Sequence, residues 1–206
     1  MLPGLLVVCA LFAGDWPQFR GVDSNGHAPG PATPVEWSDT KNVAWKVGVA
    51  GLGWSSPVIV GDRLYLTTAV PRGGSLSLRA LCFDTADGRV VWDREVRTID
   101  KAPSIHSKNS HASPTPIVRD GAVFVHFGAQ GMARLSAADG AIEWTCTELN
   151  YPPLHGNGGS PVLSEGKLLV VCDGSVEPFV AAVDARSGKV AWKTLRTVPA
   201  RISHSF

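Results

Sequence analysis

Hydrophobic residues in this chain come in short runs that are broken by turn-forming residues, and one such arrangement occurs three times. Each copy opens with Ser-Pro or Thr-Pro, continues with a short apolar run, breaks at an acidic residue next to a glycine, and resumes with a second apolar run. Two apolar runs separated by a glycine-containing turn are typical of a β-hairpin. The pattern therefore predicts three hairpins, over residues 56–66, 115–125 and 160–170.

A second shared pattern follows each hairpin. An apolar run ends at Asp or Ser, a glycine-containing turn comes next, and a tryptophan stands four residues after the glycine. A tight turn with positive φ favours glycine, and tryptophan offers a large flat surface through which one sheet packs on the next. The three copies lie at residues 83–92, 135–144 and 183–192.

Together the two patterns describe one four-stranded unit that recurs at nearly constant spacing. Its tryptophans stand at positions 92, 144 and 192, and Trp45 precedes the first of them by a similar interval. A four-stranded unit with a period of about 40 to 50 residues is typical of a β-propeller blade. We therefore expect an all-β fold with three blades, at residues 55–97, 113–149 and 159–197, and an outermost strand at residues 43–47.

The repeat resembles the PQQ-type β-propeller repeat, in which A/V-x-D-x-x-x-G-x-x-x-W closes each unit and S-P-x-x-x opens the next. Such repeats occur in quinoprotein alcohol dehydrogenases and in the outer-membrane assembly lipoprotein BamB. Residues 15–21 and 106–114 also resemble exported bacterial proteins of this family. The WD40 repeat fits less well, because Trp92 is followed by Asp but Trp144 and Trp192 are not. The resemblance is more specific for fold than for function.

Three blades fall short of a closed ring. Closed propellers have about 4 to 8 blades, and the resemblance implies seven or eight. An open arc leaves apolar blade faces and unpaired strand edges exposed, and residues 202–206 look like the approach to a fourth blade. We therefore expect residues 15–206 to be a partial propeller domain. It is either a piece of a longer chain or an arc that completes its ring with another chain.

Residues 1–14 resemble an export signal. An uncharged apolar run at residues 5–12 is too short to span a bilayer as a helix, but it suits the central part of a signal peptide. The usual basic residues before the run are absent, and Cys9 stands in a poor context for lipidation. A buried N-terminal strand or a wrongly assigned start are the alternatives. The expected location is periplasmic or otherwise extracytoplasmic, with membrane contact only through the signal or an anchor.

The charge of the chain argues against one class of partner, and its cysteines argue against two kinds of site. The formal net charge is +1 and no run of like charges occurs, which argues against nucleic acid as a partner, since its binding needs clustered Lys and Arg. Cys82, Cys146 and Cys172 lie far apart without CxxC spacing, so neither a zinc site nor a disulfide framework is indicated. Cys82 and Cys172 stand in apolar runs and are expected to be buried thiols.

Residues that could bind a ligand gather in the loops that lead into the three blades, at residues 51–55, 106–111 and 155–159. Aligned on the Ser/Thr-Pro motif, these connecting loops fall at equivalent places and should share one face near the propeller axis. Their candidate ligand-binding residues are Trp54, His106, Lys108, Asn109, His111, His155 and Asn157. The alternative is that Asn and His side chains only satisfy backbone groups between blades. Two histidines five residues apart do not make a zinc site, which needs three or four ligands.

Two function classes lead, and a hydrolytic or sugar-binding role stays open beside them. Clear repeats without a recognisable catalytic set favour an exported, non-enzymatic scaffold or protein-binding propeller, whose partner is another protein or the remaining blades of a longer chain. The alternative is a PQQ-dependent quinoprotein dehydrogenase, which only the resemblance supports. Such enzymes hold calcium through Glu, Asn and Asp, and many have a vicinal cysteine pair. This chain has no Cys-Cys and no recognisable calcium set. No cofactor is therefore predicted, no metal is expected, and PQQ stays an alternative that the residues do not support.

Overall fold

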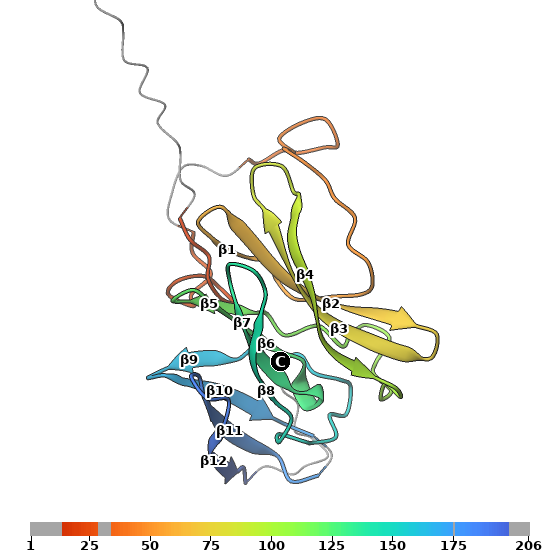
Figure 1. Ribbon diagram of the computed structural model, residues 1–206, viewed down its shortest axis with the longest axis vertical. Coiled ribbons are helices and arrows are strands. Elements are labelled where there is room, and N and C mark those ends of the chain that lie inside the picture. Colours follow the sequence, from red (N-terminus) through yellow and green to blue (C-terminus); the bar gives the residue numbers. More distant parts are fainter. Residues whose placement is uncertain (1–13, 29–33, 175, 198–206) are drawn as a thin grey trace, which may run out of the picture.

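The computed structural model describes residues 14–28, 34–174 and 176–197. These residues form three four-stranded antiparallel sheets, each built from strands that are consecutive in the sequence. The sheets follow one another as the blades of an open arc (Figure 1), which confirms the expected all-β architecture. The described residues form no closed ring. Residues 202–206 and the signal-like segment, apart from Gly14, lie outside the described residues.

The blades have the strand order in space that they have in sequence. Blade 1 consists of β1 (Val58–Val60), β2 (Arg63–Arg72), β3 (Ser75–Asp84) and β4 (Val90–Ile99). Blade 2 consists of β5 (Ile117–Arg119), β6 (Ala122–His126), β7 (Met132–Ser136) and β8 (Ile142–Cys146), with a short 3-10 helix, η1 (Gly128–Gln130), after β6. Blade 3 consists of β9 (Val162–Ser164), β10 (Lys167–Cys172), β11 (Phe179–Asp184) and β12 (Val190–Leu195).

The turn before each tryptophan strand is the most regular feature of the repeat. In blade 2, the Gly140 N–H donates to the Ser136 carbonyl at 2.9 Å, and Gly140 has φ of 70°. The equivalent glycines, Gly88 and Gly188, have φ of 74° and 73°. In every sheet, the pairing between the third and the fourth strand then shifts register near the start of the fourth strand. Such a β-bulge bends the strand and re-aims its side chains.

That turn receives the tryptophan of the preceding blade. Trp92 of blade 1 lies over Gly140 of blade 2, where an added Cβ would lie 2.8 Å from the indole ring. Its Nε1–H donates to the Ala137 carbonyl at 3.1 Å. Trp144 of blade 2 makes the same two contacts with blade 3, at Gly188 and the Ala185 carbonyl. The glycine is therefore needed both for positive φ and for the close approach of the ring.

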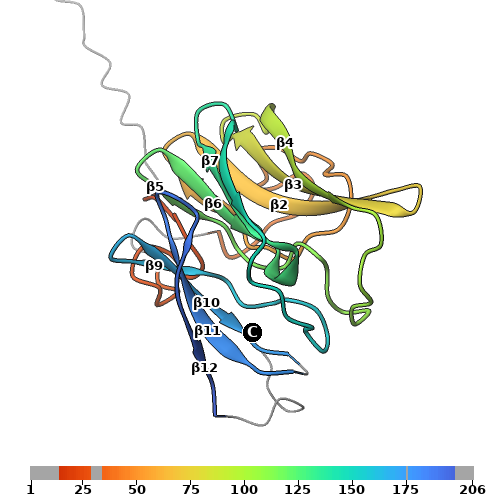
Figure 2. The same cartoon turned by 60° about the horizontal axis from the view of Figure 1, so that its bottom comes forward.

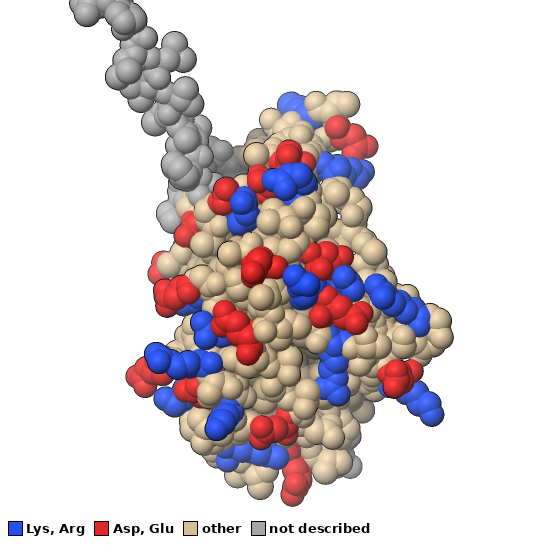
Figure 3. All heavy atoms as spheres, viewed as in Figure 1, with Lys and Arg blue, Asp and Glu red and all other residues tan. Residues whose placement is uncertain are grey.

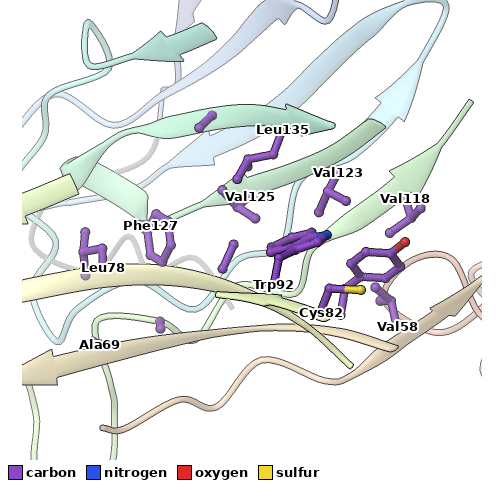
Figure 4. Packing of buried hydrophobic residues seen from close by; sticks show 14 of the residues in the cluster. Val58, Ala69, Leu78, Cys82, Trp92, Val118, Val123, Val125, Phe127 and Leu135 are labelled. Carbon is purple, nitrogen blue, oxygen red and sulfur yellow. The ribbon is translucent and has the colours of Figure 1, made fainter. Parts of the chain in front are cut away.

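The hydrophobic core lies between the blades rather than inside any one sheet. Blades 1 and 2 share a cluster in which Trp92 lies between the strands of the two sheets (Figure 4). Blades 2 and 3 share a second cluster that includes Phe124, Leu168 and Phe179. Strand β6 is buried along its whole length because it has a neighbouring sheet on both faces. Packing of one blade on the next is therefore the main source of stability.

Residues 43–47 do not form the expected outermost strand. They have no strand partner among the described residues, and Val43 and Val47 are exposed. The prediction of a strand was wrong because a β-strand needs a neighbouring edge to bond with. Trp45 nevertheless occupies the position that the repeat assigns to it, since its Nε1–H donates to the Thr85 carbonyl at 2.8 Å and its ring lies over Gly88.

The N-terminal described segment lies against the innermost strands. Trp16 exchanges two backbone hydrogen bonds with Ile59 of β1, at 2.7 and 2.9 Å. The Asp15 carboxylate accepts a hydrogen bond from the Gly61 N–H, and the Pro17 carbonyl accepts one from the Val118 N–H of β5. The segment therefore ties blade 1 to blade 2 at the inner edges of their sheets.

The surface carries both signs of charge. On the face shown in Figure 3, Lys and Arg lie interspersed with Asp and Glu, without a large field of either sign. Ion pairs such as Arg79–Asp93 and Arg134–Glu143 join neighbouring strands across their sheets. Within residues 14–28, 34–174 and 176–197, no helix is long and apolar enough to cross a bilayer.

Candidate functional site

The three connecting loops lie at one end of the sheets and are hydrogen-bonded to one another in series. The Trp54 N–H of the first loop donates to the Ala112 carbonyl, next to the second loop, at 3.1 Å. The His106 N–H of the second loop donates to the His155 carbonyl of the third at 3.2 Å. Figure 2 shows the segments after β4 and after β8 beside each other. The shared face that the repeat alignment predicts is therefore present.

Asn109 holds the second and third loops together. Its side-chain Nδ2 donates to the His155 carbonyl at 2.9 Å, and its Oδ1 accepts hydrogen bonds from the Ser110 N–H and the Ser113 hydroxyl. Gly156 lies directly against this amide, where an added Cβ would be 2.7 Å from Nδ2. These hydrogen bonds engage both polar atoms of the Asn109 amide, so the geometry gives Asn109 a role in loop structure.

Asn157 has the same character at a buried position. It is 5% exposed, and its Oδ1 accepts a hydrogen bond from the Tyr151 hydroxyl at 2.8 Å. Its amide also bonds the Ala129 N–H and the Phe127 carbonyl around η1. Gly128 gives it room, because an added Cβ there would coincide with the amide group. Asn157 therefore fixes the third loop onto blade 2 and leaves little of itself to a ligand.

His106, Lys108 and His155 form the exposed part of the cluster. The two imidazole rings stand edge to face, with centroids 5.5 Å apart. The Nδ1 of His106 accepts a hydrogen bond from the Lys108 N–H at 3.1 Å. In the neutral ring the proton then resides on Nε2, so that nitrogen has no lone pair for a metal ion. The arrangement suits a ligand that accepts hydrogen bonds better than it suits a metal.

Trp54 and His111 lie around the contact between the first and second loops. Trp54 is 64% exposed although its backbone is bonded to the neighbouring loop. His111 is half-buried, and burial lowers the pKa of its imidazole. A neutral His111 near physiological pH both accepts and donates hydrogen bonds. The structure thus brings His106, Lys108 and His155 together, and it places Trp54 and His111 further along the same surface.

The repeat alignment did not identify some residues of this surface as candidates. Leu52 and Leu154 are largely exposed beside Trp54 and His155, and Tyr151 supplies the hydroxyl that orients Asn157. None of them lies in a repeated motif, so only their position in loops marks them in the sequence.

A separate polar cleft of about 540 Å³ opens between blades 2 and 3 at the opposite end of the strands. It is lined in part by Arg119, Arg134, Glu165, Asp184 and Arg186.

The loop surface does not offer the groups that PQQ with calcium would need. Ca²⁺ is bound mainly by carboxylate and carbonyl oxygens, and residues 51–55, 106–111 and 155–159 contain no Asp or Glu. The described residues also contain no cluster of three or more His, Cys, Asp or Glu that could hold a metal ion. The residues present here therefore do not fit that cofactor.

Comparison with known proteins identifies the repeat. The family model described as outer membrane protein assembly factor BamB matches residues 35–203. The chain belongs to the PQQ-like β-propeller repeat family. Two solved quinohemoprotein alcohol dehydrogenases have the same fold over most of this chain. The enzyme from Pseudomonas putida HK5 covers 89% of it, with a TM-score of 0.64 and 21% identity. The enzyme from Comamonas testosteroni covers 88%, with a TM-score of 0.61 and 16% identity.

Curated relatives of this PQQ-like repeat chain differ in activity. It is 26% identical over 191 residues to a polyvinylalcohol dehydrogenase from Pseudomonas sp. The aligned region covers 86% of this chain and 28% of that enzyme. It is 27% identical over 135 residues to the outer membrane protein assembly factor BamB of Moranella endobia. This aligned region covers 65% of this chain and 29% of that protein. The chain therefore spans less than a third of the length of these relatives.

Proposed function

We propose that this PQQ-like repeat chain acts outside the cytoplasm as a non-enzymatic scaffold that binds another protein through its connecting-loop surface. The observation that carries the proposal is the series of hydrogen bonds through which the three loops hold one another, from Trp54–Ala112 to Asn109–His155. This surface is built before any partner arrives, which reduces the entropy lost on binding.

The exposed side chains of the surface are of the kinds that anchor protein interfaces. Trp54, Leu52 and Leu154 offer apolar contact, and Lys108 with the His106–His155 pair offers polar groups elsewhere on the same loops. Interfaces concentrate binding energy in a few aromatic anchors that a polar rim surrounds. The matching family model and one relative are described as an assembly factor for outer membrane proteins. We take a protein of that assembly process as the partner class.

Site-specific photo-crosslinking tests the proposal. A photoreactive phenylalanine analogue replaces Trp54 in the full chain, and in a matched control it replaces Asp87, an exposed residue of a turn at the opposite end of the strands. Both chains are expressed in a Gram-negative host, irradiated, and recovered from fractionated cells. We expect a discrete adduct with an extracytoplasmic protein from position 54 and none from position 87. Equal labelling at both positions, or cytoplasmic adducts only, would contradict the proposal.

The second candidate function is a quinoprotein dehydrogenase, which the match to a polyvinylalcohol dehydrogenase favours. Titration of the purified chain with PQQ and Ca²⁺, followed by quenching of tryptophan fluorescence, separates the two functions. Because the loops lack carboxylates, we expect no saturable quenching. Saturable quenching together with oxidation of an alcohol by the loaded chain would support the enzyme.

A further inference from the structure

The polar cleft between blades 2 and 3 lies at the end of the strands opposite the connecting loops. Its volume of about 540 Å³ is within the range of small-molecule sites. Blade 2 contributes residues of β5, β6 and β7, and blade 3 contributes residues in and beside the turns that follow β9 and β11. The charged residues of the lining are Arg119, Asp120, Arg134, Glu165, Asp184 and Arg186.

The three carboxylates of the cleft belong to turns of the repeat. Asp120 and Glu165 occupy the same place in the hairpin turns of blades 2 and 3, with φ of 52° and 46°. Both are exposed, so water screens their charges. The Asp184 carboxylate accepts hydrogen bonds from the Ser187 N–H and the Ser187 hydroxyl, at 2.8 and 2.7 Å. Since the equivalent Asp84 caps the turn of blade 1 in a similar way, turn structure accounts for these acids.

The three arginines, in contrast, have no counterpart at the contact between blades 1 and 2. Aligned on the repeat, the positions of Arg119, Arg134 and Arg186 are taken there by Val60, Cys82 and Ala138. At that contact Cys82 is 0% exposed and the neighbouring Tyr65 is 3% exposed. The repeat can therefore close this place with apolar side chains, whereas the contact between blades 2 and 3 keeps a cleft and three guanidinium groups.

These guanidinium groups keep hydrogen-bond donors for a ligand. The half-buried Arg134 has its Nε 2.9 Å from the Glu143 carboxylate, without an aligned hydrogen bond, and its Cζ 5.9 Å from the centre of the Phe124 ring. Its position is thus fixed from two sides. Within the part of the chain that the structure describes, the side chains of Arg119 and Arg186 form no ion pair or hydrogen bond. A guanidinium presents five donors in a planar fork that matches carboxylate and phosphate groups.

We propose that this cleft binds a small multivalent oxyanion, a molecule with two or more carboxylate or phosphate groups, through Arg119, Arg134 and Arg186. Arg134 is the central contact because it is already oriented, and the two exposed arginines reach the ligand from blade 2 and from blade 3. A ligand held from both blades stabilises their contact, so binding raises Tm. The site is separate from the connecting-loop surface and does not depend on the role of that surface.

Isothermal titration calorimetry on the full chain tests the site with citrate and with pyrophosphate, in a low-salt buffer that screens charges least. We expect saturable binding of at least one probe at one site per chain, together with a rise in Tm. The tighter probe identifies carboxylate or phosphate as the preferred group. Arg119→Gln and Arg186→Gln should each weaken binding about tenfold, because each removes a hydrogen bond between charged groups. Arg72→Gln removes an exposed arginine of blade 1 outside the cleft, and this matched control should bind like wild type.

Four outcomes would overturn the proposal. Neither saturable heat nor a shift in Tm with either probe at millimolar concentration would show that the cleft does not select oxyanions. Unchanged affinity in both cleft variants, with circular dichroism showing them folded, would place the probe elsewhere. Equal weakening in Arg72→Gln would show a general effect of surface charge. Binding of a polyglutamate peptide but of neither small probe would assign the cleft to an acidic segment of a partner protein.

Discussion

His126 is enclosed at the end of β6, with 2% of its surface exposed and no hydrogen-bond partner for Nδ1 in the described structure. Burial lowers the pKa of its imidazole to about 4, so the folded chain holds it neutral. In the unfolded chain it titrates near its usual pKa of about 6.5. The unfolded state therefore binds an extra proton between about pH 6.5 and pH 4.

Stability should consequently fall as the pH is lowered through that window. We expect a loss of about 3 kcal/mol at pH 4 relative to pH 7 from this residue, measured by urea unfolding at a series of pH values. His126→Phe should remove most of this loss, whereas replacing the exposed His27 with Gln should not. An unchanged pH profile in His126→Phe would show that other groups cause the acid sensitivity.

Gly140 illustrates how one residue serves two purposes in the repeat. It has φ of 70°, and an added Cβ would lie 2.8 Å from the ring of Trp92. Gly121 has a similar φ of 74° in a hairpin turn, but an added Cβ there meets nothing within 4 Å. Gly140→Ala should lower the free energy of unfolding by about 3 kcal/mol and Gly121→Ala by about 1 kcal/mol. Equal losses in urea unfolding would show that only backbone strain matters.

At the scale of elements, the connecting loops are held by side-chain amides rather than by regular secondary structure. Asn157→Ala would leave the Tyr151 hydroxyl and the Ala129 N–H without their partner. We expect it to lower the free energy of unfolding by about 2 kcal/mol. Lys108→Ala on the exposed part of the same surface should change it by less than about 0.5 kcal/mol. Thermal melts of the two variants test this division, and a Lys108 effect as large as that of Asn157 would refute it.

The strands themselves were predictable because their signals are local. Short apolar runs and glycine turns marked the hairpins at 56–66, 115–125 and 160–170, which correspond to β1–β2, β5–β6 and β9–β10. The strand expected at residues 43–47 did not form, although that segment is also a short apolar run. An apolar run indicates burial, but pairing depends on a neighbouring edge that a local pattern does not contain.

At the scale of the whole molecule, we expect blade 3 to open more readily than blade 1. Cys82 and Cys172 are both fully buried, and burial raises the pKa of their thiols to about 11 and about 12. Each reacts with a thiol reagent only after its sheet opens. Trp45 packs on the face of blade 1 that is turned away from blade 2. The described residues place no such cover on blade 3, so Cys172 should react about tenfold faster than Cys82 at pH 8. Peptide mass mapping of the labelled chain identifies each site, and equal rates would mean that the blades open together.

The sequence by itself determined the repeat, the three blades and the set of loops that face the same end, because each depends on short-range periodicity and on turn chemistry. Tertiary structure decided what the loop residues do, since Asn109 bonds the His155 carbonyl 46 residues away and Asn157 bonds the Ala129 N–H 28 residues away. It also decided that three equivalent tryptophans are covered to different degrees. Burial depends on which sheet lies opposite, and that neighbour is set by the stacking of blades rather than by the residues around each tryptophan.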